Sequence, residues 1–581
     1  MNQLIQKITA SKYGWLVLLA LLFGINFLAS AFHYRIDLTK EKRYTLSKAT
    51  NELVKKLDDK VEIDVFLKGD FPAGFRKLAN STEEFLQLLK DRNGSRISYR
   101  FISPQDEIPG TSVLYGDSLT SLGAAPINLT VQKKAGESVN IIFPVALVRY
   151  KGKQALVNLY PGASGRISQE ETNSAEALME YQFIKTLDKL MRDEKPGIAY
   201  ATGNGEPVDA RTYDLVQTLQ EDYQFGTINL QTQPAIPDVD VLLIVKPTEQ
   251  FTEAEKLKID QYVMRGGKLL CFIDNLIAEQ DSLAYKPETI GYDRNLNLTD
   301  LFFRYGARIN TDLVMDLQCD LIPLVVGGTA ENPQLEFLHW NYFPLFEPVK
   351  SRLLNKNMGY VAGRFVNSID TIQVPGIQKS ILLASSPNSR IIKTPALISL
   401  NENKNAPEDE KFRQSQIPVA ILLEGKFTSL YKNRASQAQR DSLAANGGGF
   451  RNESANTKMV IVADGDMVLN DILPVPNASP VPLPMGWNKY TYREYQRQSE
   501  YGKLFIPVAN RDFLLGCMEY MVNNPAIMET RNKDIVLRLL DSKKISEQRT
   551  TWQFINIGLP VLIVILAGLI YQQVRRRKYA Q

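Results

Sequence analysis

The chain has 581 residues, of which 44% are hydrophobic, and a formal net charge of +4 at pH 7. This length is enough for several domains with buried cores, and the apolar content excludes an intrinsically disordered chain. Lysine and arginine are interspersed with acidic residues, so no basic surface for nucleic acid is indicated. Three scattered cysteines and two histidines exclude a disulfide framework and a histidine-rich metal centre.

The first feature along the chain is an apolar run at residues 13–32, between Lys12 and Arg35. Its length favours an uncleaved membrane anchor, which we assign to residues 1–36. The tripeptide Ala-Ser-Ala ending at Ala31 has the form of a processing site, so a cleaved signal peptide stays open as an alternative.

Residues 37–192 predict an α/β domain with a thioredoxin-like fold. The segments 61–67 and 97–104 read as strands, and the segment 75–92 between them has helical spacing. Strand, helix and strand in this order predict a βαβ unit with a parallel strand pair. The other elements expected here are two strands and a closing helix: 127–133, 139–152 and 168–192. The absence of a Cys-x-x-Cys motif excludes thioredoxin-type redox chemistry.

Residues 195–530 predict a doubly wound α/β domain of the glutamine-amidotransferase-like or flavodoxin-like kind. Within it, the segment 239–274 contains a buried strand, a helix and a second buried strand. The helix begins at Thr252 with Glu255 three residues later, the signature of a capping box. Continuous apolar strands that alternate with amphipathic helices are typical of a sheet covered on both faces.

The end of this domain predicts how its sheet is completed. Two late strands, at 417–427 and 459–464, are expected to join the sheet that begins at residue 197. The weaker pattern between them and the early strands predicts an inserted lobe at about 276–414.

Small and acidic residues follow several of the predicted buried strands. Asp274 ends one strand, Asp464 and Asp466 end another, and Gly203 lies in the turn after a third. Ligands of open α/β sheets bind at this carboxyl edge, so these residues form a candidate ligand edge. A divalent ion or a solute could bind there, but hydrogen-bonded loop aspartates are the favoured interpretation, and we assign no metal ligand and no cofactor.

Two further groups carry candidate chemistry or contacts. Cys271 could be the nucleophile of a degenerate amidotransferase-like hydrolase, with His339 as its only candidate base. Cys271 has no flanking glycine elbow, so a buried small side chain is favoured and no catalytic residue is assigned. The aromatic residues Trp340, Tyr342 and Phe343 predict either contacts with a partner or sugar or a packed lobe core. The sequence also lacks a phosphate-binding loop for ATP.

The last thirty or so residues hold the longest uncharged apolar segment, from 550 to 574. About 20 apolar residues suffice to cross the hydrocarbon core, so a transmembrane helix is predicted at 553–574. A charged stalk at 531–552 precedes it. The tail, 575–581, begins with four cations that favour the cytoplasmic leaflet: Arg575, Arg576, Arg577 and Lys578. Two crossings place both termini in the cytoplasm and the bulk of the chain in the periplasm.

Several strings along the chain resemble one known family. They include DLTKEKRYTLS after the first apolar run, YATGNGEP, GGKLLCFID, VADGDMVLN and the terminal WQFINIGLPVLIVILAG. The chain resembles the GldG family of gliding-motility-associated ABC transporter components, within the wider ABC-transporter auxiliary family. The resemblance covers nearly the whole length.

The resemblance implies an inner-membrane protein of gliding bacteria that works with an ABC-type permease and ATPase. It implies support of gliding motility, with associated secretion as a further expectation, and it supplies no catalytic residue. The expected function is therefore a non-enzymatic transporter component in contact with membrane lipid. The alternatives from the residues are a periplasmic solute or glycan receptor and the degenerate hydrolase.

Overall fold

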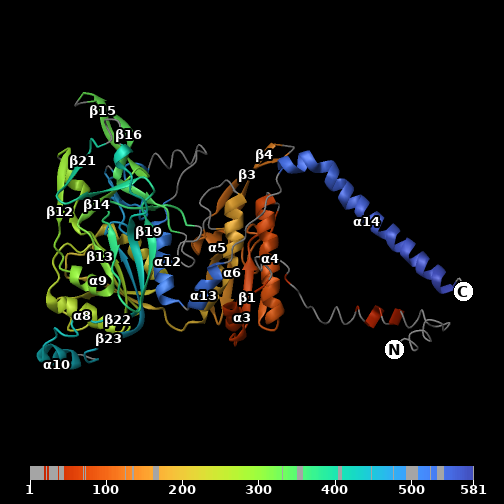
Figure 1. Ribbon diagram of the computed structural model, residues 1–581, viewed down its shortest axis with the longest axis horizontal. Helices are drawn as coiled ribbons and strands as arrows, with labels where there is room; N and C mark the ends of the chain where they lie inside the picture. The colour runs from red at the N-terminus through yellow and green to blue at the C-terminus, as the bar shows by residue number, and fades with distance from the viewer. Residues whose placement is uncertain are drawn as a thin grey trace.

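The computed structural model describes residues 45–579 except for a set of positions, together with residues 19, 20, 22–24, 26 and 37. The excepted positions are 70, 72, 125, 134–135, 161–168, 285, 330–331, 350–357, 403–408, 446–447, 476, 493–507, 524 and 533–541. Figure 1 shows a first α/β unit beside a larger unit of sheets and helices, and a long C-terminal helix that extends away from both.

The first unit is a four-stranded sheet with helices packed on it. Its elements are α3 (Lys48–Lys55), β1 (Val61–Val65), α4 (Ala73–Arg92), β2 (Ile97–Phe101), α5 (Tyr115–Ser121), β3 (Ile127–Lys133), β4 (Gly136–Ile142), β5 (Val145–Tyr150), β6 (Lys153–Asn158) and α6 (Gln169–Met191). The strand order is β2-β1-β5-β6, and β1 and β2 are parallel, which confirms the predicted βαβ unit. The antiparallel pairs β1–β5 and β5–β6 complete the sheet.

One predicted strand of this unit is wrong. The segment 139–152 forms two strands, because the chain leaves the ladder at Phe143 and Pro144, and Pro144 has no N–H to donate. The first piece, β4, pairs only with β3 among the described residues, whereas β5 joins the main sheet. The neighbouring β6 was not predicted, because its six residues alternate only weakly.

The second unit is built on a seven-stranded sheet. Its elements are β7 (Gly197–Thr202), η1 (Ala210–Thr212), α7 (Tyr213–Asp222), β8 (Gln224–Asn229), β9 (Val241–Val245), α8 (Glu253–Met264), β10 (Lys268–Phe272), β19 (Ile377–Ala384), β22 (Pro418–Thr428), α10 (Gln437–Ala445) and β23 (Glu453–Val462). The strand order is β19-β22-β23-β10-β9-β7-β8. Five neighbouring strands, β23 to β8, are parallel. All five residues of β9 are buried, as the continuous apolar run predicts.

The residues at the start of α8 predicted the beginning of this helix correctly. The backbone N–H of Glu255 donates to Thr252 Oγ1 over 3.3 Å, and the N–H of Thr252 donates to Glu255 Oε2 over 2.8 Å. This reciprocal pair is the predicted capping box.

The late strands do complete this sheet, but the predicted arrangement needs two corrections. The strand β22 is antiparallel to β23, so the sheet is mixed. The strand β19, which falls inside the expected lobe of 276–414, pairs with β22 at the sheet edge. The lobe is therefore interrupted by a strand of the main sheet, a long-range pairing that no local pattern encodes.

The remaining part of the lobe consists of small sheets around one apolar core. Its elements are β11 (Leu276–Ile277), η2 (Gln280–Ala284), β12 (Glu288–Asp293), α9 (Thr299–Tyr305), β13 (Ala307–Ile309), β14 (Asp312–Asp316), β15 (Cys319–Gly328), β16 (Pro333–Phe346), β17 (Val361–Ala362), β18 (Ile369–Thr371), β20 (Ser389–Lys393), β21 (Ala396–Ser399) and η3 (Asp409–Lys411). Trp340 lies in this core with no exposed surface.

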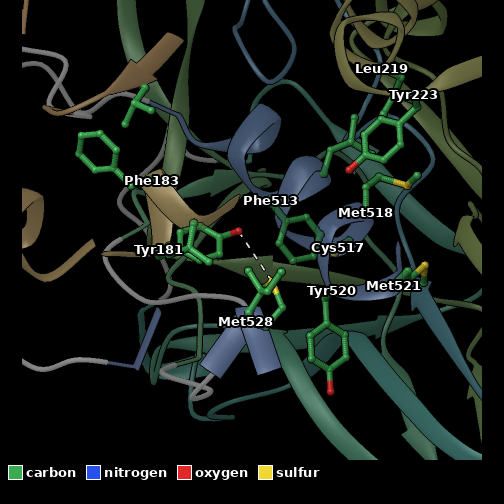
Figure 2. Packing of buried hydrophobic residues seen from close by; sticks show 14 of the residues in the cluster. Tyr181, Phe183, Leu219, Tyr223, Phe513, Cys517, Met518, Tyr520, Met521 and Met528 are labelled. Atoms are coloured by element: carbon green, nitrogen blue, oxygen red, sulfur yellow. Dashed lines mark hydrogen bonds between the residues drawn. The ribbon is translucent and has the colours of Figure 1, made fainter. Parts of the chain in front are cut away.

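Helices late in the chain join the two units. They follow β24 (Ile472–Leu473) and β25 (Val481–Pro482) and are α12 (Asn510–Val522), α13 (Pro525–Glu529) and η4 (Thr530–Asn532). Figure 2 shows Phe513 and Cys517 of α12 beside Tyr181 of α6. The Tyr181 hydroxyl and Lys185 Nζ both donate to the buried carboxylate of Glu519. Helix α6 of the first unit is thus packed and hydrogen-bonded to the second.

The last helix, α14 (Ser542–Tyr579), includes the predicted membrane segment. Trp552–Arg577 contains an 18-residue stretch with a mean hydropathy of 2.4, and none of that stretch is buried against the protein. It is the one helix of the described residues that is long and apolar enough to cross a membrane. Most of the apolar run at 13–32 lies outside the described residues; the few positions described there, such as Leu22 and Phe23, are helical and exposed.

Candidate functional site

The carboxyl edge of the seven-stranded sheet gathers charged side chains from three adjacent strands. Lys246 follows β9, Asp274 follows β10, and Asp464 follows β23. Because these strands are parallel neighbours, their ends meet at the same edge. The structure brings Asp274, Asp464 and Asp466 together: one carboxylate oxygen of each lies within 4.8 Å of the others.

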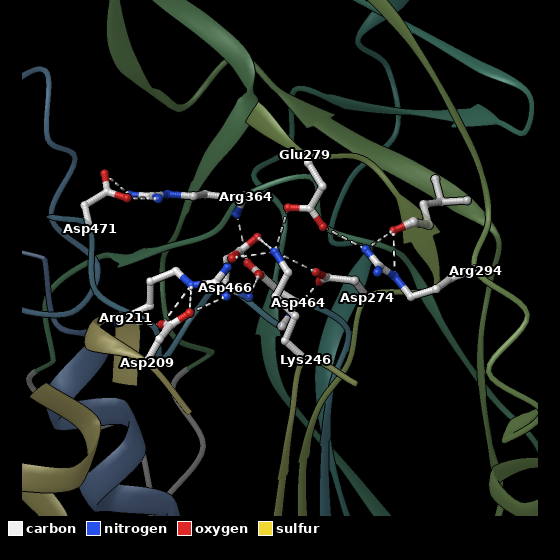
Figure 3. Close-up of polar contacts among 12 residues, drawn as sticks. Asp209, Arg211, Lys246, Asp274, Glu279, Arg294, Arg364, Asp464, Asp466 and Asp471 are labelled. Atoms are coloured by element: carbon white, nitrogen blue, oxygen red, sulfur yellow. Dashed lines mark hydrogen bonds and ion pairs between the residues drawn. The ribbon is translucent and has the colours of Figure 1, made fainter. Parts of the chain in front are cut away.

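Lys246 occupies the centre of this cluster (Figure 3). Its side chain is 4% exposed, and its Nζ lies 2.7 Å from each carboxylate oxygen of Asp466. The same Nζ lies 3.0 Å from Glu279 Oε2 and 3.5 Å from Asp274 Oδ2. The three carboxylates raise the pKa of Lys246 against the opposing effect of burial, so the ammonium stays charged.

Close backbone packing holds the loop after β23 against this lysine. A Cβ atom at Gly465 would lie 2.8 Å from Lys246 Cβ, so only glycine fits between the two aspartates of the loop. The N–H of Gly465 donates to Asp274 Oδ1 over 2.5 Å.

Asp274 and Asp464 are more deeply buried than Asp466. Burial raises the pKa of Asp274 to about 6, and burial raises the pKa of Asp464 well above its usual value. Asp464 Oδ1 accepts the N–H of Asp466, and its Oδ2 accepts the N–H of Arg364, each over 2.8 Å. These bonds fasten the lobe residue Arg364 to the end of β23.

Ion pairs continue outward from this centre. The guanidinium of Arg364 makes a two-pronged contact with Asp471, at 2.6 and 2.9 Å, and this pair lowers the pKa of Asp471. Arg211 forms a similar pair with Asp209 (Figure 3). A cavity of about 190 Å³ opens between these pairs and Lys246.

The charges of this edge therefore neutralise one another. An ammonium group already lies among the oxygens that a divalent cation would need, and burial disfavours ionisation of two of the three aspartates. The arrangement ties three strands of the sheet to lobe residues Glu279 and Arg364. What it can do chemically is hold these parts together and line a small polar cavity.

Comparison with known proteins gives the chain its family. The family model for an ABC-type uncharacterized transport system matches residues 195–501, more than half of the chain. The chain belongs to this ABC-type transport system family. A second model, for a domain of unknown function, matches residues 40–149.

This member of the ABC-type transport system family is also similar to individual proteins. An uncharacterized protein of Borreliella burgdorferi is 23% identical over 432 residues, which cover 72% of this chain and 78% of that one. Among solved structures, the mmIFT52 N-terminal domain is 12% identical with a TM-score of 0.30, over 59% of this chain and 100% of that one.

The residues nearest to Gly203 are not the aspartates of the sheet edge but Asn229 and Gln231. It has a φ of +115°, and a Cβ there would lie 3.1 Å from Asn229 Oδ1 and 3.2 Å from Gln231 Cγ. Gly203 therefore packs against the turn after β8, on the side of β7 away from β10. It serves the tight turn that its φ requires.

The aromatic candidates lie in the core of the lobe. Trp340 and Tyr342 have no exposed surface, and Phe343 is 2% exposed. The ring centroids of Trp340 and Phe343 are 4.8 Å apart in an edge-on arrangement, and Trp340 Nε1 donates to the Ser399 carbonyl. These side chains are placed as a packed core and present no ring face to a partner.

The thiol candidate is also buried. Cys271 has no exposed surface, and burial raises the pKa of its thiol. A reactive thiol needs access and a lowered pKa, and Cys271 has neither. The candidate base His339 lies in β16 of the lobe, where its Nδ1 is 3.0 Å from the Cys319 carbonyl oxygen.

Sequence reasoning missed the residues that complete the ion network. Lys246 carried the same signal as Asp274, because it also ends a continuous apolar strand, directly before Pro247. Glu279 and Arg364 carried no such signal. They come from the lobe, and only the folded path of the lobe brings them to the sheet edge.

Proposed function

We propose that this chain is a non-enzymatic, membrane-anchored component of an ABC-type transport system that works with a permease and an ATPase. Family membership supports the link to transport, and the resemblance in the sequence supports a role in bacterial gliding motility and associated secretion. We also infer a thioredoxin-like first domain and a flavodoxin-like second domain from the strand orders.

The observation that carries this proposal is the exposed apolar helix α14. At about 1.5 Å per residue, its uncharged part, residues 552–574, is about 34 Å long, more than the roughly 30 Å of a hydrocarbon core. A core helix of a soluble protein would bury one face against the body, whereas this span buries none. Exposed apolar side chains on every face are stable only in lipid.

The topology is part of the proposal. The cations Arg575, Arg576 and Arg577 follow the span and favour the cytoplasmic side of the inner membrane. With residues 13–32 as a second crossing, both termini are cytoplasmic and the folded body is periplasmic. The body would then stand next to the periplasmic surface of a permease, while the ATPase lies across the membrane.

The neutralised sheet edge supports a role in assembly over a role in catalysis. Its cations and carboxylates are already paired, and the cysteines Cys271, Cys319 and Cys517 are buried free thiols. Unchanged activity of Cys271→Ser would remove the hydrolase alternative.

The cavity of about 190 Å³ at the same edge favours one other function, a periplasmic solute or glycan receptor. A panel of soluble sugars and solutes, screened by thermal shift of the detergent-solubilised chain, separates the two functions. For a receptor, a ligand raises the unfolding temperature of the wild type and Asp464→Ala abolishes that rise. For the proposed component, no compound produces such a shift.

Purification of the full-length tagged chain from native membranes in a mild detergent tests the proposal. We expect the permease and the ATPase to be retained in fixed ratio to the chain. Recovery of the chain without either subunit, under conditions that keep the permease and ATPase together, would contradict it.

A further inference from the structure

The loops after β7 and β9 lie where the connections of the main sheet change direction. The chain passes from β7 outward to β8, returns past β7 to β9, and continues to β10. In open α/β sheets, ligands bind at the carboxyl ends of the two strands that flank such a point. The loop after β7 contains Asn204 and Glu206, and the loop after β9 leads to Glu255 in the first turn of α8.

The two loops are packed together through their backbones. The carbonyl of Asn204 accepts the N–H groups of Thr248 and Glu249, each over 2.9 Å. A Cβ atom at Gly205, whose φ is +76°, would lie 2.0 Å from Thr248 Oγ1, so this position requires glycine. The loop after β9 therefore fixes the backbone that carries Asn204.

Asn204 is hydrogen-bonded to two carboxylates. Its N–H donates to Glu206 Oε2 over 2.7 Å, and its Nδ2 donates to Glu255 Oε2 over 3.0 Å. The Gln250 carbonyl is a second acceptor for Nδ2, at 3.5 Å. Because both partners of the amide nitrogen are acceptors, the amide cannot be turned over, and Oδ1 is the atom that faces away from them.

Two buried oxygens of this group lack a donor. Asn204 is 1% exposed and Glu206 is 6% exposed. Among the described residues, neither Asn204 Oδ1 nor Glu206 Oε1 has a hydrogen-bond partner. A buried acceptor without a donor is unfavourable, so these two atoms indicate a positively charged ligand that binds oxygen.

The charge of the group also lacks compensation. At the neighbouring strand ends, the ammonium of Lys246 lies 2.7 Å from Asp466. In the part of the chain that the structure describes, Glu206 forms no such ion pair. Burial, with smaller contributions from the charges of Glu255 and Glu249, raises the pKa of Glu206 to about 7. A cation beside Glu206 would stabilise the ionised carboxylate.

We propose that Asn204, Glu206 and Glu255 bind a calcium ion. Carboxylate and amide oxygens are the ligands that Ca²⁺ prefers, and its coordination geometry is flexible. Mg²⁺ requires a near-ideal octahedron and keeps several of its own waters, which deeply buried side-chain oxygens do not favour. The ion would fasten the loop after β7 to the start of α8, whether or not the chain contacts a permease.

Calorimetric titration of the full-length, detergent-solubilised chain with calcium chloride, after metal is removed with EDTA, tests this site. We expect one calcium ion per chain, and a rise of about 3 °C or more in the unfolding temperature at saturating calcium. Magnesium chloride should bind roughly tenfold more weakly. Absence of calcium binding, or equal affinity for magnesium, would overturn the proposal.

Two substitutions locate the ion. Glu206→Gln and Glu255→Gln each remove one negative charge with little change in shape, and glutamine can keep the capping box of α8. We expect each variant to bind calcium roughly tenfold more weakly or worse, because ligand charge sets the affinity. Glu221→Gln, the same change at an exposed position of α7, is the matched control and should bind as the wild type does.

A further variant separates this site from the acidic cluster beside Lys246. Asp466→Asn should leave the calcium affinity within about twofold of wild type. If Asp466→Asn abolishes binding while Glu206→Gln and Glu255→Gln bind normally, the ion belongs to that cluster and the assignment is wrong. If Glu206→Gln does not fold, Glu255→Gln decides. Each of these results leaves the proposed function standing, because no transporter subunit takes part in the titration.

Discussion

The carboxyl edge of the main sheet and the hairpin of β15 and β16 differ in whether their side chains have partners within the fold. At the sheet edge, the buried ammonium of Lys246 meets three carboxylates, and Arg364 meets Asp471. At the hairpin, Leu335 and Phe337 are half exposed with no covering layer among the described residues.

The difference teaches which surface is left for a partner. A site whose charges are mutually paired gains little from an added ion, because each new contact must displace an existing one. An apolar face in water gains from being covered, at roughly 25 cal/mol per Å² of area removed from solvent. The acidic loop at the sheet edge is therefore accounted for by the fold, whereas the apolar hairpin keeps side chains whose burial would be favourable.

The largest expected effect is from Lys246→Met. The variant leaves the buried carboxylates without their cation, so we expect a loss of about 3–5 kcal/mol in the free energy of unfolding at pH 7. Urea unfolding of the detergent-solubilised chain measures it. Lys426→Met, at an exposed position of β22, is the control and should be close to neutral. Equal stability of the two variants would show that Lys246 is not the centre of the network.

The free energy of unfolding of Lys246→Met and Lys426→Met should also differ in its dependence on pH. Burial raises the pKa of Asp274 from 3.8 to about 6, so the folded state binds that proton more tightly than the unfolded state. Its contribution to the free energy of unfolding therefore falls as pH rises from about 4 to about 6. Without the cation of Lys246 the pKa of Asp274 rises further, so in Lys246→Met the fall should continue to higher pH. Identical pH profiles of Lys246→Met and Lys426→Met would contradict this.

A charge in the middle of α14 should have the next largest effect. Ile565→Arg places a cation at the centre of the span, at a cost of about 2.5–3.5 kcal/mol for insertion. We expect a marked rise in the fraction of chain released from membranes by alkaline carbonate. Gln572→Arg, next to the terminal cations, should stay in the pellet. Release of neither variant, or of both equally, would count against α14 as the anchor.

Breaking the link between the two units should have a smaller effect than Lys246→Met or Ile565→Arg. Glu519→Gln replaces the carboxylate that accepts from Tyr181 and Lys185, and we expect a loss of roughly 1–3 kcal/mol. Glu529→Gln, at an exposed position of α13, is the control. Thermal unfolding of the two variants measures the difference. If they unfold at one temperature, the buried bond does not hold the units together.

The smallest expected effect comes from removing the N-terminal cap of helix α8. Thr252→Ala removes the cap of α8 and should cost about 1 kcal/mol. Thr299→Ala, at the start of α9 where no side chain caps the helix, should cost less. The ordering of these two unfolding temperatures is the measurement, and a reversed order would contradict the capping role.

Local sequence patterns predicted many of the helices and strands, whereas strand pairings between separate segments were mostly not predicted. The capping box at Thr252 and the meeting of Asp274 with Asp464 and Asp466 followed from local spacing and from the rule that parallel strands end at one edge. The antiparallel β22 and the recruitment of β19 did not, because strand direction and order depend on pairings between segments that are not neighbours in the sequence. The role of Arg364 was hidden for the same reason.

Protease protection in intact spheroplasts tests the central claim most directly, since the account requires a body outside the cytoplasm held by a helix in lipid. Protease added outside should degrade the body, residues 45–532, and leave an epitope placed after Gln581 protected on a membrane fragment. A body that stays intact until the spheroplasts are lysed would contradict the account.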